Sequence, residues 1–240
     1  MAATSELRYR RLAVSEDALV VERRDGRATF RCTISPSDEK ISDGVRAEIR
    51  MPHRAVNGEE RWYRFATLVP ENFPVEDGNR VVLSQWHERM PPGVACRRPP
   101  LAHRLYGEDL LVALWSEDLI EQCGSTGPGQ ILVCDRRIRR GVFHEFIYRI
   151  AWFPDSRGRA TGWRRIATGC AATGCAAGWR RFVDHRGAIG YPAAQAYYFK
   201  MGIYTTHPFA RGMTVHHRDF ADGPTAASVG VAELAPLAMS

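Results

Sequence analysis

The stretch Tyr197-Tyr198-Phe199-Lys200-Met201-Gly202-Ile203-Tyr204 alternates apolar residues with polar or small ones. Successive side chains of a β-strand point to opposite faces, so a period of two is typical of a strand that buries one face. Its apolar members would enter a core, whereas Tyr198, Lys200 and Tyr204 would share the other face with Gly202. The stretch therefore predicts a sheet strand that carries reactive side chains on its outer surface.

Two further stretches have the same period, Val45-Arg46-Ala47-Glu48-Ile49-Arg50 and Ser84-Gln85-Trp86-His87. The first places its two arginines and Glu48 on one face, and the second places Gln85 and His87 together. Taken alone, a strand with one histidine is typical of any half-exposed sheet. Taken together, the three stretches would present guanidinium, amide, imidazole, ammonium and phenol groups on one face, which favours a groove that binds an anionic substrate.

Short segments rich in β-branched and aromatic residues recur along the chain, and turn signals such as Asp25-Gly26, Asp43-Gly44 and Asn57-Gly58 separate them. The sequence shows no convincing long amphipathic helix. This pattern predicts an all-β fold of two packed antiparallel sheets, a β-sandwich or jelly roll, in a single domain over residues 1–240. The expected strands are 18–22, 28–34, 45–51, 61–69, 80–87, 101–106, 110–115, 130–134, 143–152, 197–205, 213–220 and 228–234.

The composition is basic and only weakly informative about partners. The chain has 240 residues, 45% of them hydrophobic, with a formal charge of +6 and a pI near 9.2. This dispersed excess fits nucleic acid and acidic polysaccharide alike, and no nucleic-acid-binding motif accompanies it. No apolar run approaches the roughly 20 residues of a membrane span. Six irregularly spaced cysteines favour free thiols over a disulfide framework or a zinc site.

One segment is internally duplicated. Gly162-Trp163-Arg164-Arg165 recurs as Gly178-Trp179-Arg180-Arg181, and the unit Ala-Thr-Gly-Cys-Ala occurs twice between them. Small residues with glycine bury little surface, so we expect residues 166–178 to form a low-complexity loop between two strands. Tryptophan on a strand is more often part of a core than a platform for sugars.

Together the three stretches resemble the signature segments of jelly-roll polysaccharide lyases, R-x-E-x-R, Q-x-H and Y-F-K-x-G-x-Y. They stand here as Arg46-Ala47-Glu48-Ile49-Arg50, Gln85-Trp86-His87 and Tyr198-Phe199-Lys200-Met201-Gly202-Ile203-Tyr204. Alginate lyases, heparin-lyase-I-like enzymes and glucuronan lyases share these segments, and the resemblance extends over residues 43–229. It implies a jelly roll with a concave substrate groove, and an enzyme that cleaves a uronic-acid-containing polysaccharide by β-elimination to give 4,5-unsaturated products. Thr205-Thr206 stands where alginate lyases often carry Asn-Gln, which favours the glucuronan or heparin-lyase-like branch.

The resemblance assigns catalysis to Arg46, Gln85, His87 and Tyr204. β-Elimination removes the C5 proton beside a carboxylate, so that charge must be neutralised, and each well-placed donor stabilises the transition state by about 3–4 kcal/mol. We expect Arg46 and Gln85 in this role, and His87 and Tyr204 in proton transfer. On glucuronate or mannuronate Tyr204 would serve as base and then acid. On iduronate or guluronate His87 would be the base and Tyr204 the acid, and the sequence allows both.

Five further residues are expected to bind the substrate or to position the catalytic groups. Glu48 would orient the two arginines of its motif through charge-assisted hydrogen bonds. Lys200 would lower the pKa of the catalytic tyrosine or bind an acidic group. Arg50 and Tyr198 would contact neighbouring sugars, as would Arg104 if residues 101–106 form an adjacent strand.

The resemblance also implies a partner and a location. The partner would be an acidic polysaccharide, with no nucleic acid or membrane, and the protein would be a monomer. No cofactor is expected; some relatives bind structural calcium, but the sequence places no metal ligand. A secreted or periplasmic protein is implied, although residues 1–11 lack the apolar core of a signal peptide, so a cytoplasmic location stays open.

Two other functions compete with the lyase interpretation. A non-catalytic, lectin-like carbohydrate-binding jelly roll would need the aromatic residues and arginines, but not His87 together with Tyr204. A glycoside hydrolase would need paired carboxylates closely spaced on one strand, and the sequence has no such run.

Overall fold

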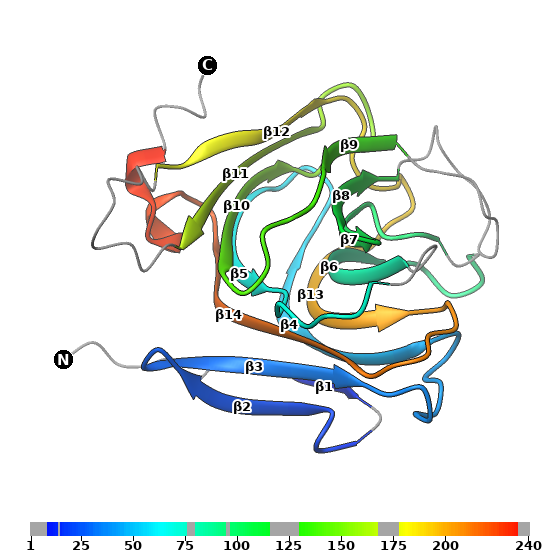
Figure 1. Ribbon diagram of the computed structural model, residues 1–240. Helices are drawn as coiled ribbons and strands as arrows, with labels where there is room; N and C mark the ends of the chain where they lie inside the picture. The colour runs from blue at the N-terminus through cyan, green and yellow to red at the C-terminus, as the bar shows by residue number, and fades with distance from the viewer. Residues whose placement is uncertain are drawn as a thin grey trace.

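Two antiparallel sheets of seven strands each pack face to face (Figure 1). The protein is represented by a computed structural model, which describes residues 9–13, 15–75, 80–94, 97–115, 130–167 and 178–234. The first sheet has the order β1-β4-β13-β6-β7-β8-β9, and the second has the order β12-β11-β10-β5-β14-β3-β2. The predicted all-β jelly roll is therefore confirmed.

The strands of the first sheet are β1 (Arg10–Ala13), β4 (Val45–Ala55), β13 (Ala196–Thr205), β6 (Arg80–Arg89), β7 (Leu101–Tyr106), β8 (Asp109–Leu114) and β9 (Gln130–Asp135). Those of the second sheet are β12 (Arg180–Arg186), β11 (Arg159–Ala167), β10 (Phe143–Ala151), β5 (Glu60–Leu68), β14 (Met213–Gly223), β3 (Arg27–Ile34) and β2 (Leu19–Arg24). Most begin and end within a few residues of the expected positions; β1, β11 and β12 were not among the expected strands.

Aromatic side chains from both sheets meet in the core between them. The ring of Trp86 in the first sheet lies 4.9 Å from the rings of both Phe199 in the same sheet and Tyr148 in the second. Phe65 of the second sheet lies 4.9 Å from Phe199, and all four side chains are buried. Large aromatic groups dominate the energetics of a core. Their burial fixes which face of β6 and β13 turns inward, and so which polar side chains turn outward.

A hydrogen bond links the second sheet to the middle of β13. Burial lowers the pKa of His217 to about 4, so its neutral ring donates from one nitrogen and accepts at the other. Nε2 donates to the carbonyl oxygen of Gly202 at 2.9 Å, and Nδ1 accepts from Thr67 Oγ1 at 3.0 Å. Gly202 has φ +150°, and a Cβ there would lie 2.2 Å from the carbonyl oxygen of Ala47. Glycine thus allows β13 and β4 to approach closely at this point.

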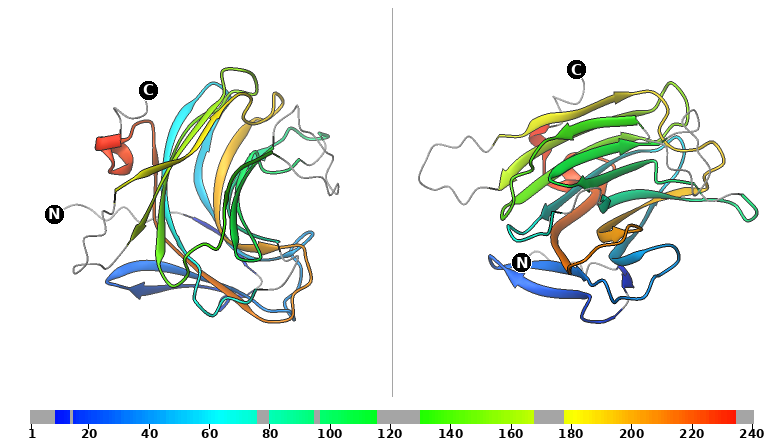
Figure 2. Two further views of the ribbon diagram at one scale, coloured as in Figure 1. Left: turned by 45° about the horizontal axis from the view of Figure 1, so that its top comes forward. Right: turned by 45° about the vertical axis from the view of Figure 1, so that its right-hand side comes forward.

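The expectation of a strand at residues 228–234 is wrong. The segment forms two short 3-10 turns, η2 (Ala227–Val229) and η3 (Ala232–Leu234). Gly230 between them adopts a left-handed conformation with φ +73°, which interrupts an extended strand. The apolar residues of these turns pack against Trp62 and Trp163, whose rings stack 5.7 Å apart on the second sheet. Figure 2 shows this C-terminal segment beside that sheet.

The duplicated segment provides the paired strands β11 and β12. Trp163 stands opposite Arg181, and Arg164 opposite Arg180. Trp163 is buried and Trp179 packs against the same apolar cluster, as expected of packing residues. Of the expected loop at 166–178, residues 166 and 167 belong to β11, and residues 168–177 lie outside the described part of the chain.

Two of the six cysteines, Cys32 and Cys134, fall within the described residues, and both are free thiols. Burial raises the pKa of the Cys32 thiol above its ordinary value. Over the same residues, no helix is long and apolar enough to cross a membrane.

Candidate active site

The predicted site residues lie side by side on the outer face of the first sheet. Strand β13 pairs with β4 on one side and with β6 on the other. A register shift in β6 between Val82 and Ser84 keeps Trp86 in the core while Val82, Gln85 and His87 face outward. The register then arranges the site in three successive levels along β13, centred on Tyr204, on Glu48 and on Tyr198.

The first level joins Tyr204 to Arg46, which stands opposite it on β4. The Arg46 guanidinium lies 4.2 Å from the centre of the Tyr204 ring. Asp43 Oδ1 accepts hydrogen bonds from Tyr204 Oη at 2.9 Å and from Arg46 Nη2 at 3.0 Å. A Cβ on Gly44 would lie 2.5 Å from the Tyr204 ring, so glycine lets this turn close onto the tyrosine.

The environment of Tyr204 stabilises the protonated phenol. Burial raises the pKa of Tyr204 well above its ordinary value, and Asp43 adds to the increase through its hydrogen bond and its charge. Arg46 opposes the increase without cancelling it. Lys200 is not among the main groups that shift this pKa; it binds the acidic group Glu48, which is the other role expected for it. The phenol carries its proton at neutral pH.

The second level is organised around the carboxylate of Glu48. Glu48 Oε1 accepts a hydrogen bond from Gln85 Nε2 at 2.6 Å, and Oε2 accepts one from Lys200 Nζ at 3.1 Å. Arg46 Nη1 lies 3.5 Å from the same Oε2. The Glu48 and Lys200 side chains are only 2% and 5% exposed, so each is the main counter-charge of the other. Glu48 thus orients Arg46 as expected, but Lys200 and not Arg50 is its second cation.

The third level contains His87, Tyr198 and Arg50. The rings of His87 and Tyr198 are stacked 5.5 Å apart, and the Arg50 guanidinium lies 5.2 Å from the Tyr198 ring. His87 Nδ1 lies 3.1 Å from the carbonyl oxygen of Glu88 and 3.3 Å from its Oε2. Two acceptors beside Nδ1 favour the tautomer with the proton on that nitrogen, which leaves Nε2 as a proton acceptor.

The three levels form an elongated row. Tyr204 stands opposite Val82, and His87 follows five residues later on β6, a separation of about 15 Å along the strand. The two proton-transfer candidates therefore do not contact each other. They flank the donors Gln85 and Lys200.

A polysaccharide lyase family model matches residues 14–223, nearly the whole chain. This chain belongs to the polysaccharide lyase family. The match confirms the resemblance carried by the three stretches, and it makes the protein an enzyme of the polysaccharide lyase class. No curated protein sequence matches the chain.

Solved structures share the fold at low sequence identity. An endo-β-1,4-glucuronan lyase from Trichoderma reesei has a TM-score of 0.62 and 17% identity, with 93% of this chain and 90% of that one covered. An alginate lyase from Aplysia kurodai has a TM-score of 0.60 and 10% identity, covering 87% and 88%. The alginate lyase of a Chlorella virus has a TM-score of 0.53 and 9% identity, covering 86% and 89%.

Sequence reasoning missed two residues of this polysaccharide lyase site, Asp43 and Glu88. Asp43 belongs to an Asp-Gly turn signal, so its contact with Tyr204 depends on how the turn folds over β13. Glu88 follows His87, so strand alternation would place it on the opposite face. The strand ends one residue later, and there the Glu88 side chain reaches the His87 ring.

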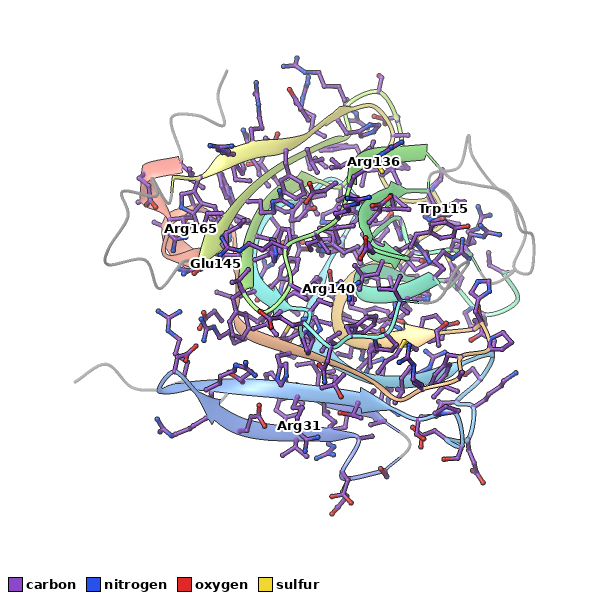
Figure 3. All side chains as sticks on the ribbon, viewed as in Figure 1. Arg31, Trp115, Arg136, Arg140, Glu145 and Arg165 are labelled. Atoms are coloured by element: carbon purple, nitrogen blue, oxygen red, sulfur yellow. The ribbon has the colours of Figure 1, made fainter. Side chains whose placement is uncertain are left out.

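Other features of the surface lie apart from this row. A cavity of about 290 Å³ at the ends of β4 and β13 is lined by none of the predicted site residues. On the second sheet Glu145 Oε2 accepts a hydrogen bond from Arg165 at 2.7 Å and lies 3.4 Å from Arg64 (Figure 3 labels Glu145 and Arg165). Within the described ranges, no three His, Cys, Asp or Glu side chains are grouped as metal ligands.

Proposed function

We propose that this polysaccharide lyase cleaves a uronic-acid-containing polysaccharide by β-elimination and releases 4,5-unsaturated products. One observation carries the proposal: two neutralising donors, Arg46 and Gln85, contact the same buried carboxylate, Glu48, and the protonated phenol of Tyr204 lies against Arg46. That arrangement supplies charge stabilisation and a proton donor on one face, which are two of the three requirements of an elimination beside a carboxylate; the third is a base for the C5 proton.

Arg46 and Gln85 would neutralise the uronate carboxylate. A guanidinium has five N–H donors and an amide nitrogen has two, so both residues can hold Glu48 and still donate to a substrate. As the C5 proton leaves, negative charge spreads from C5 into the carboxylate. Donors already fixed by Glu48 stabilise that charge without reorganising, which is the source of the rate enhancement.

Tyr204 would supply the proton to the leaving group. The C5 proton passes to a base, its bonding electrons form the C4–C5 double bond, and the C4–O bond breaks. The departing oxygen then needs a proton. A phenol kept protonated by burial and by Asp43 is suited to give it.

Which group removes the C5 proton depends on the configuration of the uronate at C5. In iduronate and guluronate the C5 proton and the C4 oxygen lie on opposite sides of the sugar ring. His87 Nε2, at the other end of the row from Tyr204, would then accept the C5 proton. In glucuronate and mannuronate they lie on the same side, and Tyr204 must pass its own proton to Asp43, 2.9 Å away, before it can accept another. Glucuronan and alginate lyases among the solved structures of this fold support a polymer rich in uronates.

The test is an assay on a panel of uronate polymers: glucuronan, alginate, heparin, hyaluronan and chondroitin. We expect ultraviolet absorbance of the 4,5-unsaturated product with at least one polymer, and its loss in Tyr204→Phe with the far-ultraviolet circular dichroism unchanged. Binding of a polymer without any absorbance change would identify a lectin-like protein instead. Full activity of Tyr204→Phe would overturn the role of the phenol.

A further inference from the structure

Arg104 on β7 is a deeply buried cation. Its side chain is nearly inaccessible, with the residue 8% exposed, and its Nε has no hydrogen-bond partner. None of the described carboxylates forms an ion pair with it. Burial, followed by repulsion from Arg80 and Arg98, lowers the pKa of Arg104 to about 9. The guanidinium is nevertheless charged at neutral pH, and no carboxylate of the described residues compensates that charge.

A second polar group beside Arg104 is also unpaired. The Trp115 ring lies 6.0 Å from the Arg104 guanidinium, at the end of β8 (Figure 3). Its indole Nε1 is buried without a hydrogen-bond acceptor, and the residue is 3% exposed. Two neighbouring buried donors that both lack an acceptor indicate a binding site for a ligand that supplies an acceptor.

The location adjoins the first level of the active site. Arg104 stands opposite Val82, and Val82 stands opposite Tyr204 on its other side. Neighbouring strands are about 4.8 Å apart, so Arg104 lies roughly 10 Å across the sheet from Tyr204. Val82, which stands between them, is buried and has no polar side-chain group.

Arg80 adds a second cation on the same face. It begins β6, two residues before Val82, and stands opposite Tyr106, a residue that is 51% exposed. Within the described residues no carboxylate forms an ion pair with Arg80. Two guanidinium groups and the exposed Tyr106 thus lie on the same face of the sheet as Tyr204.

We propose that Arg104 and Arg80 form a subsite that binds the carboxylate of the sugar next to the cleaved bond, on the β7 side of Tyr204. This inference rests on the proposed function. An unpaired buried charge destabilises a fold, so it is retained where a ligand supplies the missing partner. The subsite would make the enzyme prefer polymers of consecutive uronates over polymers in which uronates alternate with neutral sugars.

The test measures binding in the Tyr204→Phe background, by calorimetry, to tetrasaccharides of glucuronate, mannuronate and guluronate. Each has a carboxyl-reduced counterpart as the neutral control. We expect Arg104→Met to weaken binding of at least one uronate tetrasaccharide about 10- to 100-fold, and to leave binding of the neutral counterpart unchanged. Arg31→Met, on β3 of the second sheet (Figure 3), removes the same charge and should leave binding within about twofold of the background value.

Thermal denaturation separates a binding role from a structural one. Arg104→Met removes an unpaired buried charge, so it should melt at a higher temperature than the parent protein. Equal binding by Arg104→Met and its parent would overturn the subsite and leave the proposed function intact. A lower melting temperature with weaker binding would show that Arg104 supports the fold instead. No binding of any uronate tetrasaccharide by either protein would overturn both proposals.

Discussion

The carboxylate of Glu48 is predicted to be the energetic centre of the active site. Glu48→Gln removes the negative charge that compensates Lys200, whose side chain is 5% exposed. It also replaces the acceptor that fixes Gln85 Nε2 at 2.6 Å. The substitution keeps the size of the side chain, so its effect reports the charge and not a cavity.

The expected loss follows from the burial of the pair. Breaking a buried ion pair by removing one partner costs about 3–5 kcal/mol, because the remaining charge is left unpaired. Lys200→Met should cost somewhat less, because Arg46 and Gln85 still bind Glu48. The double variant Glu48→Gln/Lys200→Met leaves neither of these two charges, so its loss should be smaller than the sum of the single losses by about 2 kcal/mol.

Urea denaturation of the four proteins gives the coupling energy, and a second pair provides the control. Arg27 and Asp219 form an ion pair at 2.7 Å with side chains 52% and 23% exposed. Arg27→Met should therefore cost no more than about 1 kcal/mol, because it leaves Asp219 beside Arg218 unchanged. Losses at Glu48 and Lys200 that add within about 0.5 kcal/mol would refute a coupled pair at the centre of the site.

Three further predictions concern other levels of the structure. His87→Asn should abolish cleavage of guluronate or iduronate polymers while largely sparing glucuronate or mannuronate ones; equal loss on both classes would contradict the stereochemical assignment. Gly202→Ala should destabilise the fold by about 1–3 kcal/mol, because its Cβ would meet the Ala47 carbonyl at 2.2 Å; unchanged urea unfolding would show that β13 and β4 separate easily. His217 has a folded-state pKa of about 4 against an ordinary 6.5, so only the unfolded state binds its proton between those values. Its contribution to stability should fall by about 2 kcal/mol from pH 7 to pH 5, and His217→Gln should reduce that slope; an identical slope would contradict the assignment.

The alternation of three short stretches predicted the face that carries the site, because side-chain direction on a strand follows from the backbone alone. It predicted the outward side chains of β4 and β13 directly. On β6 the same rule applies only within each half of the strand, since the shift between Val82 and Ser84 reverses which residues face the core. Such a shift depends on the neighbouring strands and leaves no local signal in the sequence.

The contacts among site residues were less predictable than their positions. Glu48 pairs with Lys200, 152 residues away in sequence, because the register of β4 against β13 brings them together. Asp43 reaches Tyr204 only through the turn that precedes β4. The false strand at 228–234 has the opposite cause: its alternating apolar residues do bury, but against Trp62 and Trp163 from two turns around Gly230.

The fate of the cleaved bond tests the proposed elimination most directly. The polymer that gives the strongest signal should be cleaved in water labelled with oxygen-18, and the masses of the products measured by mass spectrometry. Elimination takes no oxygen from water, so we expect an unsaturated uronate at the new non-reducing end and no heavy oxygen at the cleaved bond. A saturated product with one heavy oxygen from the solvent would show hydrolysis and contradict the account.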